Sequence, residues 1–217
     1  DLDAPLARSQ PAQLGPFRVL RQIGRGGMGD VFHGERNDGA FEQQVALKLI
    51  RADYAGLGLD ERFRRERQIL ARLQHAHIAR LIDGGVSAGG QPWLAMEFVD
   101  GVDLATWVAS NCPDLRRRIA LFIKICGAVA FAHRALIVHR DLKPANVLVN
   151  ANDEPKLLDF GIAKLVDDES TALTQTIAAG LTLRYAAPEQ VLGDRTTTAT
   201  DVYALGVMLW ELIKNQR

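Results

Sequence analysis

Three kinds of polar group are concentrated in one stretch of this 217-residue chain, His139-Arg140-Asp141-Leu142-Lys143-Pro144-Ala145-Asn146. A lysine follows Asp141 by two residues and an amide follows it by five. On one loop, a carboxylate can accept a hydroxyl proton, an ammonium group can neutralise developing charge, and an amide oxygen can bind a metal ion. The combination is typical of a loop that surrounds a phosphoryl group during transfer.

Two motifs follow this loop. Asp159-Phe160-Gly161 offers a second carboxylate for a metal ion, after a short predicted hairpin formed by Val147–Val149 and Lys156–Leu158. Ala187-Pro188-Glu189 closes the segment.

A glycine pattern of the type GxGxxG lies near the other end, at Gly24, Gly26 and Gly29. Glycines let the backbone approach phosphate oxygens closely, because they have no Cβ. The same pattern also opens helices that bind dinucleotides, but here a predicted strand follows instead of a helix. A plain hairpin turn is the remaining alternative.

One lysine, Lys48, interrupts the apolar segment Val45-Ala46-Leu47. A half-buried lysine needs an anion close by, and Glu66 on the next predicted helix is a candidate partner. A lysine at the surface of an edge strand is the alternative.

Charge and cysteine content exclude several classes of protein. The chain carries 26 basic and 26 acidic side chains and so lacks the basic surplus of nucleic-acid binders. No apolar run approaches the roughly 18 residues of a membrane helix, so no membrane contact is expected from this segment. Its two cysteines are too few for a disulfide framework and favour a reducing, cytoplasmic setting. Because the chain begins at Asp1 and shows no signal peptide, we expect it to be part of a longer protein. A membrane anchor elsewhere in that protein is left open, with this segment as its cytoplasmic part.

Local patterns predict a β-rich part followed by a helical part. Residues 1–16, with three prolines, are expected to form a leader or linker. Short apolar runs separated by turn residues predict strands at 17–23, 30–34, 44–50, 79–86 and 92–99. Helical spacing predicts helices at 60–73, 104–110, 115–135 and 200–214. In the 115–135 helix we expect Ile119, Phe122, Ile123, Cys126 and Ala130 to share the apolar face.

Taken together and in order, these motifs resemble the eukaryotic-like (Hanks-type) protein Ser/Thr kinase family, in its bacterial branch, from Phe17 to the end of the chain. The resemblance implies an α+β, bilobal protein-kinase-like fold, with a β-rich N-lobe at 17–99 and a mainly helical C-lobe at 100–217. The C-lobe is expected to be incomplete, because the chain stops after the helix containing Asp201. The implied activity is transfer of the γ-phosphate of ATP, with Mg²⁺, to Ser or Thr hydroxyls of protein substrates.

The resemblance also assigns roles to individual residues. It implies that Asp141 is the catalytic base, assisted by Lys143, Lys48, Glu66 and Thr182, and that Asn146 and Asp159 bind Mg²⁺. Contacts with ATP are implied for Ile23, Gly24, Arg25, Gly26, Gly27, Met28, Gly29, Val31, Ala46, Lys48, Met96, Glu97, Val99, Asp103 and Leu148. Asp201 would brace the backbone of the loop at 139–146.

Arg140, beside the implied base, suggests control by phosphorylation of the loop before Ala187. Thr174 and Thr176 are the candidate sites, modified by a second copy of the protein in a transient pair. Two other functions stay open. One is a non-catalytic kinase-fold scaffold, which normally lacks one of the metal or catalytic residues that are intact here. The other is a small-molecule phosphotransferase, which usually lacks the lysine at 143 and the motif at 187–189.

Overall fold

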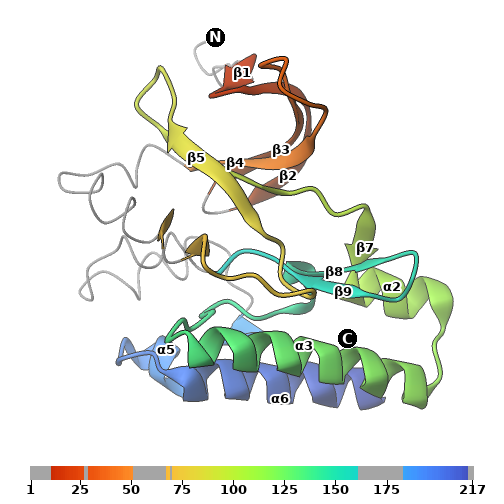
Figure 1. Ribbon diagram of the computed structural model, residues 1–217. Coiled ribbons are helices and arrows are strands. Elements are labelled where there is room, and N and C mark those ends of the chain that lie inside the picture. Colours follow the sequence, from red (N-terminus) through yellow and green to blue (C-terminus); the bar gives the residue numbers. More distant parts are fainter. Residues whose placement is uncertain (1–10, 27–28, 51–66, 69, 161–182, 215–217) are drawn as a thin grey trace, which may run out of the picture.

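The computed structural model describes residues 11–26, 29–50, 67–68, 70–160 and 183–214 (Figure 1). A curled sheet occupies one end of the molecule, and helices occupy the other (Figure 1). The expected α+β, bilobal fold is confirmed.

The large sheet has six antiparallel strands in the order β1-β2-β3-β4-β6-β5. The strands span Gln13–Leu14 (β1), Phe17–Gly26 (β2), Gly29–Arg36 (β3), Gln44–Ile50 (β4), Leu81–Val86 (β5) and Pro92–Glu97 (β6). All five predicted strands are therefore confirmed, with shifts of a few residues at their ends.

Alternation along these strands gives the sheet two different faces. One face is closed by a small core of Leu14, Phe17, Val19, Phe32, Val45, Leu47, Trp93 and Ala95. Ala46 and Lys48 alternate with Val45 and Leu47 and therefore lie on the other face. Ala46 is directly opposite Met96 in the register of β4 and β6. Three of the residues expected around the nucleotide, Ala46, Lys48 and Met96, thus lie on one face of this sheet.

Part of the segment predicted to be a leader or linker forms a strand of the large sheet instead. Residues 13–14 form β1 and pair with β2, and Leu14 is only 1% exposed. Gly15 makes this possible: its φ is 57°, and a Cβ there would overlap the Trp93 ring. The strand was not predicted because two residues are too few to show a period.

The C-terminal part is built around three helices, Leu104–Asn111 (α2), Leu115–Arg134 (α3) and Thr198–Lys214 (α6). A short sheet, β7 (Gly101–Asp103), β8 (Val147–Asn150) and β9 (Pro155–Leu157), lies above α3 (Figure 1). The short helix α5 spans Pro188–Leu192. Helices α3 and α6 lie side by side, and Arg118 of α3 donates a hydrogen bond to the Leu212 carbonyl of α6 at 3.0 Å. The predicted helices in this part are confirmed, whereas residues 60–66 and 69 of the other predicted helix lie outside the described part of the chain.

The buried face of α3 agrees with the predicted one only in part, because Phe122 is buried and Cys126 packs against the core as expected. Ile123 is 63% exposed and Ala130 is exposed, whereas Leu121, Ile125 and Ala128 are buried. Two apolar stripes run along this helix, and local spacing does not decide between them. The stripe that packs is the one that meets α6 and the short sheet.

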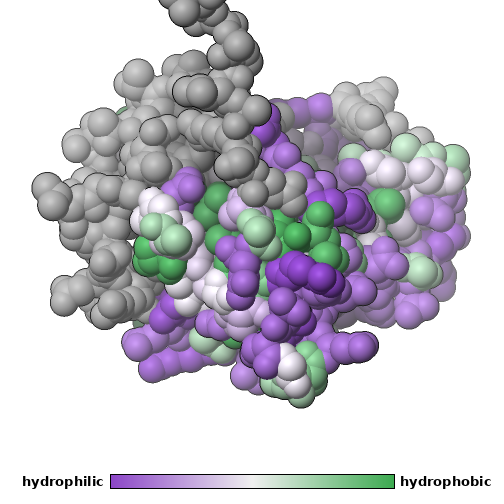
Figure 2. Space-filling view, turned by 90° about the horizontal axis from the view of Figure 1, so that it is seen from above, coloured by the Kyte–Doolittle hydropathy of each residue, from purple (hydrophilic) through white to green (hydrophobic). Residues whose placement is uncertain are grey.

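The main core continues from α3 to the loops at 137–160 and to the lysine-bearing face of the large sheet. It includes Leu70, Leu94, Val147, Phe160 and Met208. Seen from above, the surface shows hydrophobic residues in separate patches among hydrophilic ones (Figure 2). Among the described residues, no helix combines the length and apolar character needed to cross a membrane.

Replacing Leu14 tests whether β1 is part of the folded unit. We expect Leu14→Ala to lower the free energy of unfolding by about 2–4 kcal/mol, because it leaves a cavity against the core of the large sheet. Gln13→Ala, on the exposed side of the same strand, should change it by less than about 0.5 kcal/mol. Urea denaturation measures both, and equal effects of the two variants would show that β1 is not docked.

Candidate active site

One buried carboxylate, that of Asp201 on α6, binds the backbone of the loop at 139–146. Asp201 in the first turn of α6 is 1% exposed. Its Oδ2 accepts a hydrogen bond from the backbone N–H of His139 at 2.8 Å, and its Oδ1 accepts one from the N–H of Arg140 at 2.9 Å. Nε2 of His133 on α3 lies 2.7 Å from Oδ2. Asp201 therefore braces the loop backbone, as the resemblance implied, and through His133 it also joins α3 to the loop.

His139 is fully buried, and its hydrogen bonds define its proton. Nε2 lies 2.8 Å from the Leu158 carbonyl, which can only accept, so Nε2 carries the hydrogen. Nδ1 accepts the backbone N–H of Asp141 at 3.3 Å and must be unprotonated. Burial lowers the pKa of this imidazole below its usual value, against the opposing effect of Asp201. The ring is consequently neutral, and it ties the Asp141 loop to the residue before Asp159.

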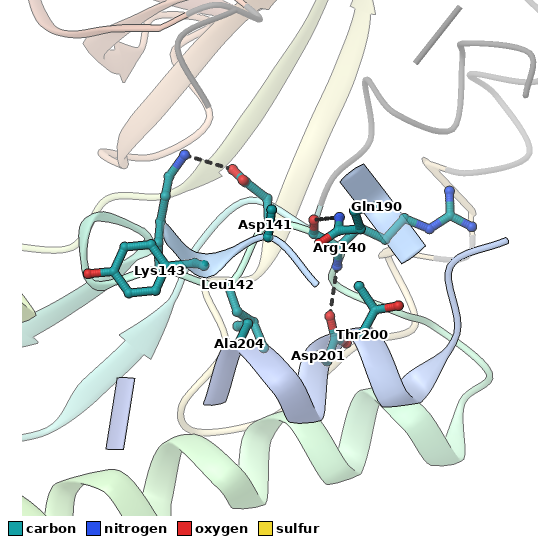
Figure 3. Close-up of a pocket in the computed structure, with 10 residues that line it drawn as sticks. Arg140, Asp141, Leu142, Lys143, Gln190, Thr200, Asp201 and Ala204 are labelled. Atoms are coloured by element: carbon teal, nitrogen blue, oxygen red, sulfur yellow. Dashed lines mark hydrogen bonds and ion pairs between the residues drawn. The ribbon is translucent and has the colours of Figure 1, made fainter. Parts of the chain in front are cut away.

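Asp141 and Lys143 point toward each other at the end of this loop (Figure 3), and Asn146 reaches the same carboxylate. Lys143 Nζ lies 3.0 Å from Asp141 Oδ2. The Asn146 amide donates to the same oxygen at 3.0 Å and to the Asp141 carbonyl at 2.7 Å. The short helix at Pro144–Asn146 turns the chain so that the three side chains predicted from their spacing meet.

Lys48 reaches the same region from the large sheet. Its side chain is mostly buried, and Nζ lies 2.9 Å from Asp159 Oδ2. The predicted partner, Glu66, lies outside the described residues. Asp159 has a φ of 49°, in the left-handed region that non-glycine residues adopt at a cost. The backbone N–H of Leu158 donates to the backbone carbonyl of Asn146 at 2.8 Å, which places Asp159 beside Asn146.

The two predicted metal ligands have the chemistry that Mg²⁺ requires. Asp159 Oδ1 is buried and has no hydrogen-bond donor in the described structure. A buried carboxylate oxygen without a donor is costly unless a cation compensates it. The Asn146 nitrogen is committed to Asp141, which leaves its carbonyl oxygen as the atom for a metal. An oxygen pair of this kind suits Mg²⁺, which takes its other ligands from water and phosphate.

The glycine pattern lies on a β-hairpin. Gly24 is opposite Val31, Arg25 opposite Asp30, and Gly26 opposite Gly29. Gly29 has a φ of 154°, and a Cβ there would overlap the Leu49 carbonyl oxygen of the neighbouring strand. Arg25 is largely exposed and pairs with Asp30 at 2.9 Å. Gly27 and Met28 lie outside the described residues.

The residues expected near the adenine are distributed over both lobes. Val31, Ala46 and Leu148 are half-buried, Met96 is 9% exposed, and Ile23 is exposed at the edge. Glu97 Oε1 accepts a hydrogen bond from Lys156 at 2.6 Å, and the Glu97 N–H donates to the Arg80 carbonyl at 2.8 Å, so both groups already have protein partners. Val99 follows on the half-buried connection between the lobes.

Asp103, expected near a ribose, has a clear local role. It caps α2, because its Oδ1 accepts the Thr106 N–H at 3.0 Å and its Oδ2 accepts the Thr106 hydroxyl at 2.6 Å. Thr182, the last predicted catalytic residue, lies outside the described part of the chain.

A pocket lies between the Asp141 loop, α5 and α6 (Figure 3). It is lined by Arg140, Asp141, Leu142, Lys143, Tyr185, Ala186, Gln190, Thr200, Asp201 and Ala204. Thr200 donates its hydroxyl hydrogen to Glu189 at 2.6 Å, which holds the pKa of that carboxyl below its usual value. Because Asp141 and Lys143 both line the pocket, it opens next to their ion pair.

Comparison with known proteins agrees with this geometry. The family model of the protein kinase domain matches residues 17–217. The chain belongs to the protein kinase family. A probable serine/threonine-protein kinase of Streptomyces coelicolor is 39% identical to the kinase domain over 210 residues, which are 94% of this chain and 31% of that protein. The serine/threonine-protein kinase PknB of Mycobacterium tuberculosis is 40% identical over 212 residues, which are 95% of this chain and 34% of that protein.

A solved structure leads to the same family. The PknI kinase domain of Mycobacterium tuberculosis superposes on this kinase domain with a TM-score of 0.73 and 28% identity, covering 96% of this chain and 79% of that one. The chain therefore spans about a third of the length of its curated relatives and most of a solved kinase domain.

Two residues of the kinase domain were not anticipated from the sequence. His133 binds Asp201 from α3, and Gln190 on α5 donates to the Arg140 carbonyl at 2.8 Å. Neither belongs to a motif that chemistry alone would select. Their partners lie 68 and 50 residues away along the chain, so only the folded structure reveals them.

Gly24 and Gly29 of the hairpin differ in the space that a side chain would have, and mutagenesis can test this difference. We expect Gly29→Ala to lower the free energy of unfolding by about 2 kcal/mol or more, because the methyl group would overlap the Leu49 carbonyl. Gly24→Ala should have little effect on stability, since its Cβ would make only an ordinary contact with Val31 at 3.5 Å. Thermal unfolding distinguishes the two, and an equally stable Gly29→Ala variant would contradict the described hairpin.

Because His139 is buried and neutral, we expect the free energy of unfolding to depend on pH. Its pKa in the folded state is lowered, so the unfolded chain takes up the proton first, and stability should fall as the pH decreases below about 6.5. The slope is at most about 1.4 kcal/mol per pH unit for one such group. Urea denaturation between pH 7.5 and 5 measures it.

Burial also lowers the pKa of His75, which therefore contributes to the same slope. The variant His75→Gln removes that contribution, and the slope that remains is expected to come from His139. A stability that stays constant over this pH range in the His75→Gln variant would contradict a neutral, buried His139.

Proposed function

We propose that this protein is a serine/threonine protein kinase that transfers the γ-phosphoryl group of ATP to hydroxyl groups of proteins. The observation that carries the proposal is the convergence of two groups. Asp141 meets Lys143 and Asn146 at one end of the loop, and the Lys48–Asp159 ion pair reaches the same place from the sheet. The relatives named above as serine/threonine-protein kinases support the same activity.

In the proposed reaction, the oxygen of a Ser or Thr side chain attacks the γ-phosphorus, and the bond from that phosphorus to the β-phosphate oxygen breaks, releasing ADP. Asp141 takes the hydroxyl proton. Lys143 and Asn146 both contact Oδ2 of Asp141, so Oδ1 is the oxygen that we assign to this proton. Lys143 is close enough to Asp141 to offset negative charge on the transferring group as well.

Lys48 and the glycine hairpin are assigned to the nucleotide. Lys48 would hold phosphate oxygens. Its ammonium group has three N–H donors, so it can bind phosphate as well as Asp159. The ends of the two hairpin strands, which carry Gly24, Gly26 and Gly29, would place backbone N–H groups over the phosphates. The residues assigned to the adenine and ribose are Ile23, Val31, Ala46, Met96, Glu97, Val99, Asp103 and Leu148.

Asn146 and Asp159 are the residues that we assign to Mg²⁺. The ion would neutralise charge on the phosphate oxygens and so favour attack by a neutral hydroxyl. On the protein side, Asp159 is oriented by Lys48, while the Leu158 backbone is held by Asn146 and His139. The chain thus prepares the carboxylate for a cation before any ligand binds.

We further propose that the protein phosphorylates itself at Thr174 or Thr176 through a transient pair of copies. The sequence supports this proposal, because Arg140 beside the base could bind a phosphate on that segment. Both threonines lie outside the described residues.

Substitution of the proposed base is the decisive test. Asp141→Asn should lower the rate of phosphoryl transfer by about 100-fold or more, because an amide cannot accept the proton. Asp194→Asn, an exposed aspartate outside the pocket, serves as the matched control and should keep full activity. Mass spectrometry of the full-length protein after incubation with Mg·ATP measures phosphate on Thr174 and Thr176, alongside transfer to a peptide substrate.

A folded wild-type protein that binds ATP but transfers no phosphate to itself or to peptides would contradict the proposal and favour a scaffold. Equal transfer by wild type and Asp141→Asn would remove Asp141 from its assigned role.

A further inference from the structure

The Gln190 side chain connects two segments of the pocket that are distant in sequence. Its Nε2 donates a hydrogen bond to the Arg140 carbonyl at 2.8 Å (Figure 3). Its Oε1 accepts one from the Ala187 N–H at 3.2 Å. One atom donates and the other accepts, which an amide can do and a carboxylate cannot. The Ala187 bond caps the start of α5, whereas the Arg140 bond leaves the helix and reaches the loop.

The acceptor of this bond belongs to an unusual part of the backbone. Arg140 has a φ of 67°, in the left-handed region that a non-glycine residue adopts at a cost. A backbone of this kind persists only where its surroundings hold it. Asp201 holds the N–H of Arg140, and Gln190 holds its carbonyl.

The carbonyl of Arg140 and the N–H of Asp141 are the two polar groups of a single peptide unit. Gln190 binds the oxygen, and His139 Nδ1 accepts the hydrogen at 3.3 Å. Because a peptide unit is planar, these two contacts fix its rotation. That rotation sets the direction in which the Asp141 side chain leaves the backbone.

We propose that Gln190 is a positioning residue for phosphoryl transfer, which links α5 to the peptide unit before Asp141 and thereby orients the base. The inference rests on the proposed function of Asp141. It makes the placement of the base depend on α5, on the far side of the pocket.

Two substitutions separate positioning from simple capping of α5. Gln190→Glu keeps an oxygen for the Ala187 N–H but cannot donate to Arg140, whereas Gln190→Ala loses both bonds. If Gln190 positions the base, both variants lower kcat by between about three- and tenfold, the effect of losing one hydrogen bond. KM for ATP stays unchanged, because the large sheet is untouched. Leu192→Ala, on the same helix and 74% exposed, is the matched control and should leave kcat unchanged.

Hydrogen exchange at the Asp141 amide provides a readout that does not depend on activity. In the full-length protein, Gln190→Glu should speed exchange at this amide, while amides of α3 and α6 keep the wild-type rate. Unchanged kcat and unchanged Asp141 exchange in Gln190→Glu would overturn the proposal. A general increase of exchange throughout the domain would also overturn it, because that result indicates a stability effect.

The same experiment separates this inference from the proposed function. If the wild type shows no phosphoryl transfer, the proposed function fails. The exchange rate at Asp141 then decides the positioning role by itself: faster exchange in Gln190→Glu supports it, and an unchanged rate overturns it.

Discussion

The carboxylate of Asp201 is the contact on which the arrangement of the site depends. It is buried at the start of α6, and its two oxygens accept the N–H groups of His139 and Arg140 and meet the ring of His133. A buried carboxylate is stable only when donors satisfy it, and here the donors come from α3 and from the loop itself. The helical lobe and the loop with Asp141 therefore support each other. The left-handed backbone at Arg140 follows directly after these two N–H groups, so Asp201 holds the chain where it enters this turn.

From this contact, a chain of hydrogen bonds reaches the proposed metal site. His139 joins the Asp141 N–H to the Leu158 carbonyl, and Leu158 returns its N–H to the Asn146 carbonyl. The two predicted Mg²⁺ ligands are thus placed by backbone groups that also hold the proposed base. Tilted packing of the His139 and Phe160 rings, with centroids 4.8 Å apart, closes the same region with apolar surface. Proton transfer and metal binding would share one rigid frame, which suits a reaction that relies mainly on positioning and electrostatics.

The large sheet contributes through its two faces. Its small core of Phe17, Leu47 and Trp93 on one side leaves the other side to Ala46, Lys48 and Met96. Lys48 is buried there against Asp159, so one ion pair joins the lobes at the point where phosphates would lie. The N-terminal strand β1 extends this sheet, and its one buried residue, Leu14, adds to the same core.

Much of this arrangement follows from the sequence alone, because it is written in local patterns. Strand alternation and helical spacing placed the strands and helices, and the spacing of Asp141, Lys143 and Asn146 was enough to bring them together on one loop. Only the tertiary structure decided which stripe of α3 is buried, that Leu14 docks, that Lys48 meets Asp159, and that Gln190 reaches Arg140. In each of these cases the deciding contact joins residues far apart in the chain. Local spacing limits what a side chain can reach, but the partner it meets is chosen by the packing of the whole domain.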